Sequence, residues 1–159
     1  MIDEIINELN GLPQEELQSI YNLIVAKKLT YQKPLAFVQE LMKFLFVGVR
    51  DGKYYYQMHV GEELANRYGI LHGGLMTAFV DTAMAETTFH VDPDVARALT
   101  LNITVDFIKP AHVGKVLDAE VSTVQNSHSI IVFQVNIFEE NELVATALAH
   151  FYKQYSKRS

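Results

Sequence analysis

The sequence predicts an α+β fold built as one domain, and three observations support that prediction. Apolar residues recur at helical spacing from residue 1 to about residue 47. A long, mostly apolar segment then occupies about residues 73–89, and segments rich in Val and Ile with short polar turns follow it. The 159 residues suffice for one hydrophobic core. Helices followed by successive strands are typical of an α+β domain.

The N-terminal part is predicted to form three helical segments. Gly11 interrupts the apolar pattern and ends the first segment. Pro13 opens the second, because proline fits the first turn of a helix, where its missing N–H is not needed. Pro34 opens the third segment, whose apolar side is expected to reach Leu45.

The strands are predicted from alternation and turn residues. The stretch "FLFVGVRDGKYYYQMHV" predicts a hairpin whose turn is Asp51-Gly52. A helix from about Gly73 to Phe89 follows, and the Pro and Asp residues of "HVDPDVAR" indicate a loop. The remaining segments, "ALTLNITVDFIKP", "GKVLDAEVSTVQN", "SIIVFQVNIFEEN" and "ELVATALAHFYKQY", predict an antiparallel meander.

One carboxylate, Asp81, lies in the middle of the apolar helix. Thr77, Asp81 and Thr88 are spaced by four and seven residues, so they share one stripe of that helix. The stripe faces either solvent or a cleft, and spacing alone does not choose between them. In a cleft, partial burial would tune Asp81 for work as a base or a nucleophile.

Two glycines, Gly73 and Gly74, open the same helix. Without side chains they let a ligand approach the backbone N–H groups of the first turn, which together with the helix dipole stabilise negative charge. They would suit a developing oxyanion. The alternative is that the pair only makes a tight turn and permits close packing.

Composition disfavours several classes of function. The formal net charge of -6 is unsuited to nucleic acid, whose phosphates require a basic surface, or to an anionic membrane surface. The absence of cysteine excludes disulfides, thiolate zinc sites and cysteine nucleophiles. No segment is long and apolar enough for a bilayer span, and the acidic N-terminus does not resemble a signal peptide. We therefore expect a cytoplasmic protein.

Known catalytic motifs of other kinds are missing from the sequence. The six histidines are scattered and show no metal-ligand spacing, so no metal is expected. A serine hydrolase would carry G-x-S-x-G, whereas "GILHG" has His72 at the place of the serine. No phosphate-binding loop or dinucleotide fingerprint appears.

The segment "NRYGILHGGLMTAFVDTAMA" resembles the signature of hotdog-fold acyl-CoA thioesterases of the PaaI type. Further on, "TLNITVDFIKPAHVG" and "VATALAHFY" resemble strands of that family, and the resemblance covers about residues 45–153. It implies an antiparallel sheet wrapped around one central helix. The shared residues are Asn66, Gly69, His72, Gly73, Gly74, Asp81, Thr82 and Ala83.

The resemblance also implies roles for individual residues. Asp81 matches the catalytic carboxylate, acting as base or nucleophile, and Gly73 matches the residue whose backbone N–H polarises the thioester carbonyl. Asn66 matches a polar residue beside the thioester or the attacking water. Thr100 is expected to help position water near the Asp of the partner subunit. His72 is expected to support the loop or to contact the thioester.

The implied activity is hydrolysis of an acyl-CoA to a free acid and CoA, with no cofactor because a thioester is already activated. His72, Gly74, Thr77 and Met84 are expected to contact the substrate, and the acyl group stays open. Active sites are implied at the interface of a homodimer, and a homotetramer is also compatible. Residues 1–44 would be a helical extension and residues 45–159 the hotdog thioesterase domain.

Other features of the sequence leave alternatives. Glu86 departs from the family pattern, and it would face solvent, pair with a basic group or narrow the acyl pocket. Lys109, Lys115 and His128 are candidates for contacts to the CoA nucleotide.

Two other functions compete with hydrolysis. The main alternative is a non-catalytic acyl-CoA-binding hotdog protein that senses its ligand, since fold does not fix function. A hotdog dehydratase or isomerase acting on acyl-CoA is the second. The presence of both Asp81 and Asn66 favours the enzyme, because binding alone requires neither.

Overall fold

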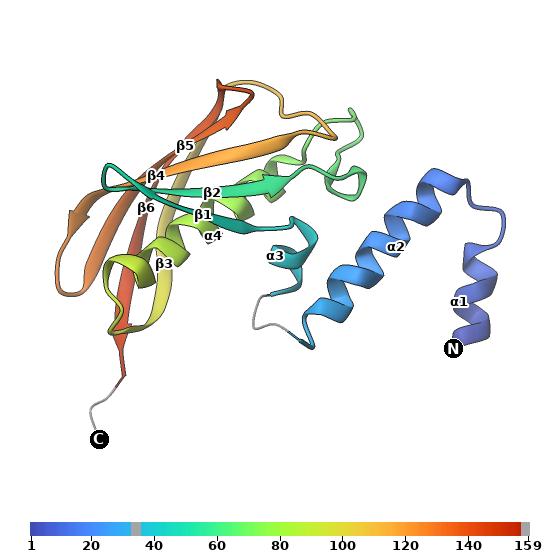
Figure 1. The fold of residues 1–159 in the computed structure, drawn as a ribbon, viewed down its shortest axis with the longest axis horizontal. Helices are drawn as coiled ribbons and strands as arrows, with labels where there is room; N and C mark the ends of the chain where they lie inside the picture. Colours follow the sequence, from blue (N-terminus) through green and yellow to red (C-terminus); the bar gives the residue numbers. More distant parts are fainter. Residues whose placement is uncertain (33–35, 157–159) are drawn as a thin grey trace.

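A six-stranded antiparallel sheet wraps around one long helix (Figure 1). The computed structural model describes residues 1–32 and 36–156. The central helix is α4 (Gly73–Val91). The strands, in their order across the sheet, are β1 (Leu45–Arg50), β2 (Lys53–His59), β4 (Val116–Asn126), β5 (Ile130–Glu139), β6 (Glu142–Tyr155) and β3 (Val95–Phe107). This is the hotdog fold of the α+β class, as the sequence predicted.

The predicted hairpin is confirmed, and its turn has the expected backbone. Asp51 and Gly52 have φ values of 50° and 72°, the left-handed conformation that a two-residue turn of this kind needs at both positions. The predicted loop after α4 is shorter than expected. His90 and Val91 continue the helix, and β3 already begins at Val95.

The predicted meander is only partly right, because it contains β4, β5 and β6 but not β3. After β3 the chain crosses the end of the sheet, where the Val60 N–H donates to the Lys115 carbonyl and β4 starts beside β2. Strand β3 pairs with β6 instead and forms an edge of the sheet. Its outward-facing Leu99 and Leu101 are 46% and 60% exposed.

The N-terminal part is helical, with α1 (Ile2–Leu9), α2 (Gln14–Leu29) and α3 (Phe37–Leu41). Pro34, where the third segment was predicted to open, lies outside the described residues. The prediction that this segment reaches Leu45 is wrong, since Lys43 has a φ of 51°, incompatible with a continuing helix, and Leu45 begins β1. Helix α2 packs on α3 and on the short helix η1 (Glu62–Leu64), whereas α1 lies farthest from the sheet (Figure 1).

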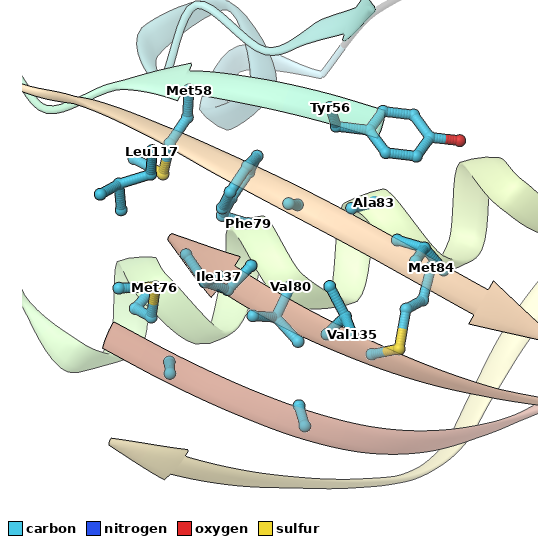
Figure 2. Packing of buried hydrophobic residues seen from close by; sticks show 14 of the residues in the cluster. Tyr56, Met58, Met76, Phe79, Val80, Ala83, Met84, Leu117, Val135 and Ile137 are labelled. Carbon is cyan, nitrogen blue, oxygen red and sulfur yellow. The ribbon is translucent and has the colours of Figure 1, made fainter. Parts of the chain in front are cut away.

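The hydrophobic core lies between α4 and the concave face of the sheet (Figure 2). Phe79, Val80, Ala83 and Met84 of α4 have no exposed surface. Burying side chains of this kind stabilises the fold by roughly 2 kcal/mol each. The core fixes the rotation of α4, and that rotation decides where Asp81 points.

Candidate functional site

The loop before α4 folds tightly around Asn66. The Asn66 N–H donates to the Ile70 carbonyl at 2.8 Å, and the Gly69 N–H donates to the Asn66 carbonyl at 3.0 Å. The Asn66 Oδ1 accepts a hydrogen bond from the Tyr68 N–H at 2.8 Å. This bond fixes the amide so that its Nδ2 group is left to donate, and Nδ2 has no acceptor within residues 1–32 and 36–156.

The first turn of α4 leaves one particular donor unused. The His72 Nδ1 accepts from the Gly74 N–H at 3.0 Å, while the His72 carbonyl accepts from the N–H groups of Leu75 and Met76. In the described part of the chain, the Gly73 N–H has no acceptor. Because it lies at the positive end of the helix dipole, this N–H can bind a negatively charged oxygen.

A cavity of about 340 Å³ brings these two unused donors together. Asn66 and Gly73 both line it, and the rest of its wall is mainly apolar. A methyl group on Gly73 would lie 3.5 Å from the Phe107 ring, which is ordinary contact. The other lining residues are Ile70, Leu71, Met76, Phe107, Ile108, Lys109, Pro110 and Ala111.

The carboxylate forms a second, separate group. Asp81 is half-buried and accepts a hydrogen bond from the Thr100 hydroxyl at 2.7 Å. This bond joins α4 to β3 within one chain, and the expectation that Thr100 also lies near the Asp of a partner stays a prediction. Asp81 lies eight residues after Gly73 on the same helix, so the two are about 12 Å apart along its axis.

The stripe that carries Asp81 is not a solvent face throughout. Thr77 is half-buried and donates to the Gly73 carbonyl at 3.0 Å, and Thr88 is fully buried. Of the predicted substrate contacts, Gly74 has its N–H occupied by His72, and Met84 lies wholly in the core. Their roles toward a substrate stay predictions.

Glu86 lies half-buried and accepts a hydrogen bond from the Gln39 amide of α3 at 3.4 Å. It therefore contacts the N-terminal helices and does not join the Asp81–Thr100 pair. Among residues 1–32 and 36–156, no basic group pairs with Glu86, and whether it narrows the acyl pocket stays a prediction.

The basic groups named from the sequence have partners in this chain. The Lys109 ammonium lies 2.8 Å from Glu142, and the Lys115 ammonium lies 2.6 Å from Glu140. The hydrogen bond that the Lys115 ammonium donates to the Glu140 carboxylate raises the pKa of Lys115. The His128 ring stacks on Tyr155 with centroids 5.1 Å apart.

Sequence reasoning missed the contacts that prepare Asn66 and the cavity. The bond from Tyr68 to Asn66 could have been found, because an Asn followed three residues later by Gly is typical of a turn closed by the Asn side chain. Phe107 in the cavity wall was missed for a different reason, since strand alternation does not show which edge of a sheet borders a helix end.

Two further observations concern metals and membranes. Within the described ranges, no three His, Asp or Glu side chains gather as a metal-ligand set. None of the helices in these ranges combines the length and the apolar character needed to cross a membrane.

The chain is similar to a known protein family in sequence and to solved proteins in structure. Residues 68–146 match the family model of the thioesterase superfamily. No curated protein matches the chain. A Bacillus halodurans protein solved with CoA has a TM-score of 0.83 and 21% identity, covering 94% of this chain and 99% of that one. Since residues 1–44 are more than a quarter of the chain, this likeness includes most of the N-terminal helices.

Two other solved structures share the fold. The PaaI protein of the Escherichia coli phenylacetic acid degradation operon has a TM-score of 0.67 and 18% identity, covering 84% of this chain and 94% of that one. A Streptococcus mutans protein bound to acetyl CoA has a TM-score of 0.64 and 20% identity, covering 72% and 91%. Residues 68–146 are therefore similar to the thioesterase superfamily, and the chain shares the hotdog fold with these solved structures.

Proposed function

We propose that this protein hydrolyses an acyl-CoA to the free acid and CoA. The observation that carries the proposal is the pair of unused donors, the Gly73 N–H and the Asn66 amide, on one mainly apolar cavity. An acyl-transfer reaction uses N–H donors of this kind to stabilise the oxyanion that forms at the carbonyl. The thioesterase superfamily match supports hydrolysis, and the structures with CoA and acetyl CoA support the acyl-CoA substrate.

In the proposed reaction, the thioester carbonyl oxygen accepts hydrogen bonds from Gly73 and Asn66. Asp81, oriented by Thr100, takes a proton from water while the water oxygen bonds to the carbonyl carbon. The resulting oxyanion is stabilised by the donors and by the positive end of α4. The carbon–sulfur bond then breaks, and the leaving thiolate receives the proton from Asp81.

A second route through Asp81 has the same donors. The carboxylate attacks the carbonyl carbon, CoA leaves, and water cleaves the anhydride. Turnover in isotopically labelled water separates the two routes, because water attacking the aspartyl carbon of the anhydride leaves labelled oxygen in Asp81. In both routes the thioester supplies its own activated leaving group, so no cofactor is proposed.

The site is proposed to be completed by a second copy of the chain. One carbonyl cannot reach the Gly73 N–H and a water held by Asp81 when these lie about 12 Å apart on one straight helix. The exposed edge of β3, with Leu99 and Leu101 on its surface, offers a second copy a place to pair. A symmetric dimer would then bring Gly73 and Asn66 of one protomer to Asp81 and Thr100 of the other.

The test is free-thiol release from a panel of acyl-CoAs by the wild type and by Asp81→Asn. We expect wild-type turnover and a loss of roughly 10³-fold in kcat for Asp81→Asn, since a positioned base contributes that order. Asp94→Asn, in the exposed loop after α4, is the matched control and should turn over like the wild type.

Absence of wild-type turnover on every acyl-CoA would contradict the proposal. If acyl-CoA still bound in that case, the ligand-sensing alternative would replace hydrolysis. Turnover that persisted in Asp81→Asn would leave thioester hydrolysis in place but remove Asp81 from it.

A further inference from the structure

The proposed substrate carries phosphates that the cavity does not accommodate. In a CoA thioester the pantetheine arm separates the reacting carbonyl from the nucleotide. If the carbonyl lies at Gly73 and Asn66, the nucleotide must lie outside the cavity, along the surface near its rim. A cation at that rim would have to be available to phosphate, so it must not already be neutralised by a carboxylate.

Most basic side chains near the site fail this requirement. Lys109 lines the cavity but pairs with Glu142, and Lys115 pairs with Glu140. Farther away, Lys53 pairs with Glu120, and the buried Lys153 pairs with Asp92.

Arg67 meets the requirement. It is exposed and directly follows Asn66, which lines the cavity. Its guanidinium carbon lies 4.9 Å from the centre of the Tyr68 ring, and its Nη2 donates to the Tyr68 hydroxyl at 2.6 Å. No carboxylate pairs with Arg67 within residues 1–32 and 36–156. A guanidinium in this state keeps most of its donors available and matches the geometry of phosphate oxygens.

Tyr68 connects Arg67 to the loop before α4 that carries Asn66. Tyr68 is 70% exposed, and the Arg67 guanidinium lies over the face of its ring. The Tyr68 N–H donates to the Asn66 Oδ1, so the backbone that carries the ring is hydrogen-bonded to the same amide that lines the cavity. A phosphate bound by Arg67 would therefore be held at a fixed place relative to the oxyanion donors.

We propose that Arg67, positioned by Tyr68, binds a phosphate group of the CoA nucleotide at the rim of the cavity. This inference rests on the proposed function for the identity of the substrate. It places Arg67 before Lys109 and Lys115, which already pair with carboxylates, as the first basic contact. It also assigns a substrate-recognition role to two residues, Arg67 and Tyr68, that lie between Asn66 and Gly69 of the motif.

The test compares two substrates with the same acyl group, an acyl-CoA and an N-acetylcysteamine thioester that lacks the nucleotide. In Arg67→Met, which keeps an unbranched side chain but removes the guanidinium, the ratio of kcat/KM for the CoA substrate to that for the short thioester should fall about tenfold, the order of one charge-assisted contact. The change should lie in KM for the CoA substrate.

Arg50→Met is the matched control, because Arg50 also lies over a tyrosine ring, at 4.3 Å from Tyr55, but on the distant β1–β2 hairpin. It should leave the substrate ratio unchanged. An unchanged ratio in Arg67→Met, or an equal change in Arg50→Met, would overturn the inference.

Binding of CoA itself, measured by calorimetry on the full chain, separates this inference from the proposed function. If the wild type bound CoA but hydrolysed nothing, weaker CoA binding by Arg67→Met would support the phosphate contact while hydrolysis failed. If the wild type did not bind CoA, the inference would be overturned.

Discussion

The two halves of the candidate site differ in how complete they are within one chain. At the start of α4, the Gly73 N–H and the Asn66 Nδ2 group have no acceptor among residues 1–32 and 36–156, and both residues line a cavity. Eight residues later on the same helix, Asp81 already accepts a hydrogen bond from Thr100, and Asp81 is outside that cavity. The first half therefore offers two N–H donors to a ligand oxygen. In the second half, one carboxylate oxygen of Asp81 is already bonded to Thr100, and only the other oxygen is left for a water or a substrate.

This difference shows how one helix serves two functions without bringing them together. Its N-terminus supplies donors and a positive dipole, while its middle supplies a carboxylate that accepts a hydrogen bond from Thr100 of β3. One face of the helix is held against the sheet by the core, and the helical rise keeps the two halves apart (Figure 2). A second copy of the chain is the simplest way to bring a donor half to a carboxylate half.

Beyond Asp81→Asn, the largest effect is expected from removing the Gly73 N–H. Gly73→Pro deletes that single donor at the first helical position, where proline is well tolerated, and His72 before it has the extended backbone that proline requires. Steady-state kinetics should show kcat reduced by roughly 10²–10³-fold, as for other oxyanion donors.

Gly73→Ala is the control for this change, because it keeps the N–H and adds a methyl group in ordinary contact with Phe107. It should retain most of the activity. Equal losses in the two variants would show that the space at Gly73, and not its donor, matters.

A smaller effect is expected on the carboxylate half. Thr100→Val removes the hydroxyl that donates to Asp81 but keeps the shape of the side chain, so Asp81 loses its orientation. We expect kcat to fall about tenfold, the order of one hydrogen bond to a charged group. Thr100→Ser restores the donor and should recover activity; failure to do so would assign Thr100 a packing role only.

The smallest effect on activity is expected from Asp92, which is the C-cap residue of α4. Asp92 accepts hydrogen bonds from the buried Lys153 and from the Tyr155 hydroxyl, and these lower its pKa. Asp92→Asn leaves the Lys153 ammonium without its carboxylate and should reduce the free energy of unfolding by about 2 kcal/mol at neutral pH. Urea unfolding measures this loss.

The pH dependence of that loss follows from the direction of the shift. A lowered pKa in the folded state means that Asp92 contributes stability above its unfolded pKa of about 4. That contribution disappears as the pH falls through the lower folded value, so the wild type and Asp92→Asn should converge in acid. Asp94→Asn, two residues along the chain, should have the same free energy of unfolding as the wild type. A difference between the wild type and Asp92→Asn that persisted in acid would exclude the ionised pair as its cause.

The elements of the fold were largely predictable from the sequence because they depend on local patterns. The Asp51-Gly52 dipeptide is a strong signal for a two-residue hairpin turn. The long apolar segment of α4 is typical of a buried helix. The place of β3 was not predictable in this way. Its position beside β6 depends on a chain crossing held by long-range hydrogen bonds, which strand alternation does not encode.

The candidate site was predictable to the level of residue names but not of geometry. Asn66, Gly73 and Asp81 were chosen through the motif, and the structure groups the first two on one cavity. The split between Gly73 and Asp81 follows from helical rise, so it was available from the sequence. The Thr100 bond to Asp81 of the same chain was not, because it depends on how β3 crosses α4.

The measurement that tests the central claim most directly uses two inactive variants together. Asp81→Asn and Gly73→Pro are co-expressed with different affinity tags, and the mixed dimers are isolated through both tags. Each mixed dimer then has one site with an intact Gly73 and an intact Asp81, contributed by different chains, and one site with neither. The account predicts thiol release at about half of the wild-type rate per dimer, since one of two symmetric sites is restored. Mixed dimers as inactive as either parent would contradict it, because both residues would then have to act from the same chain.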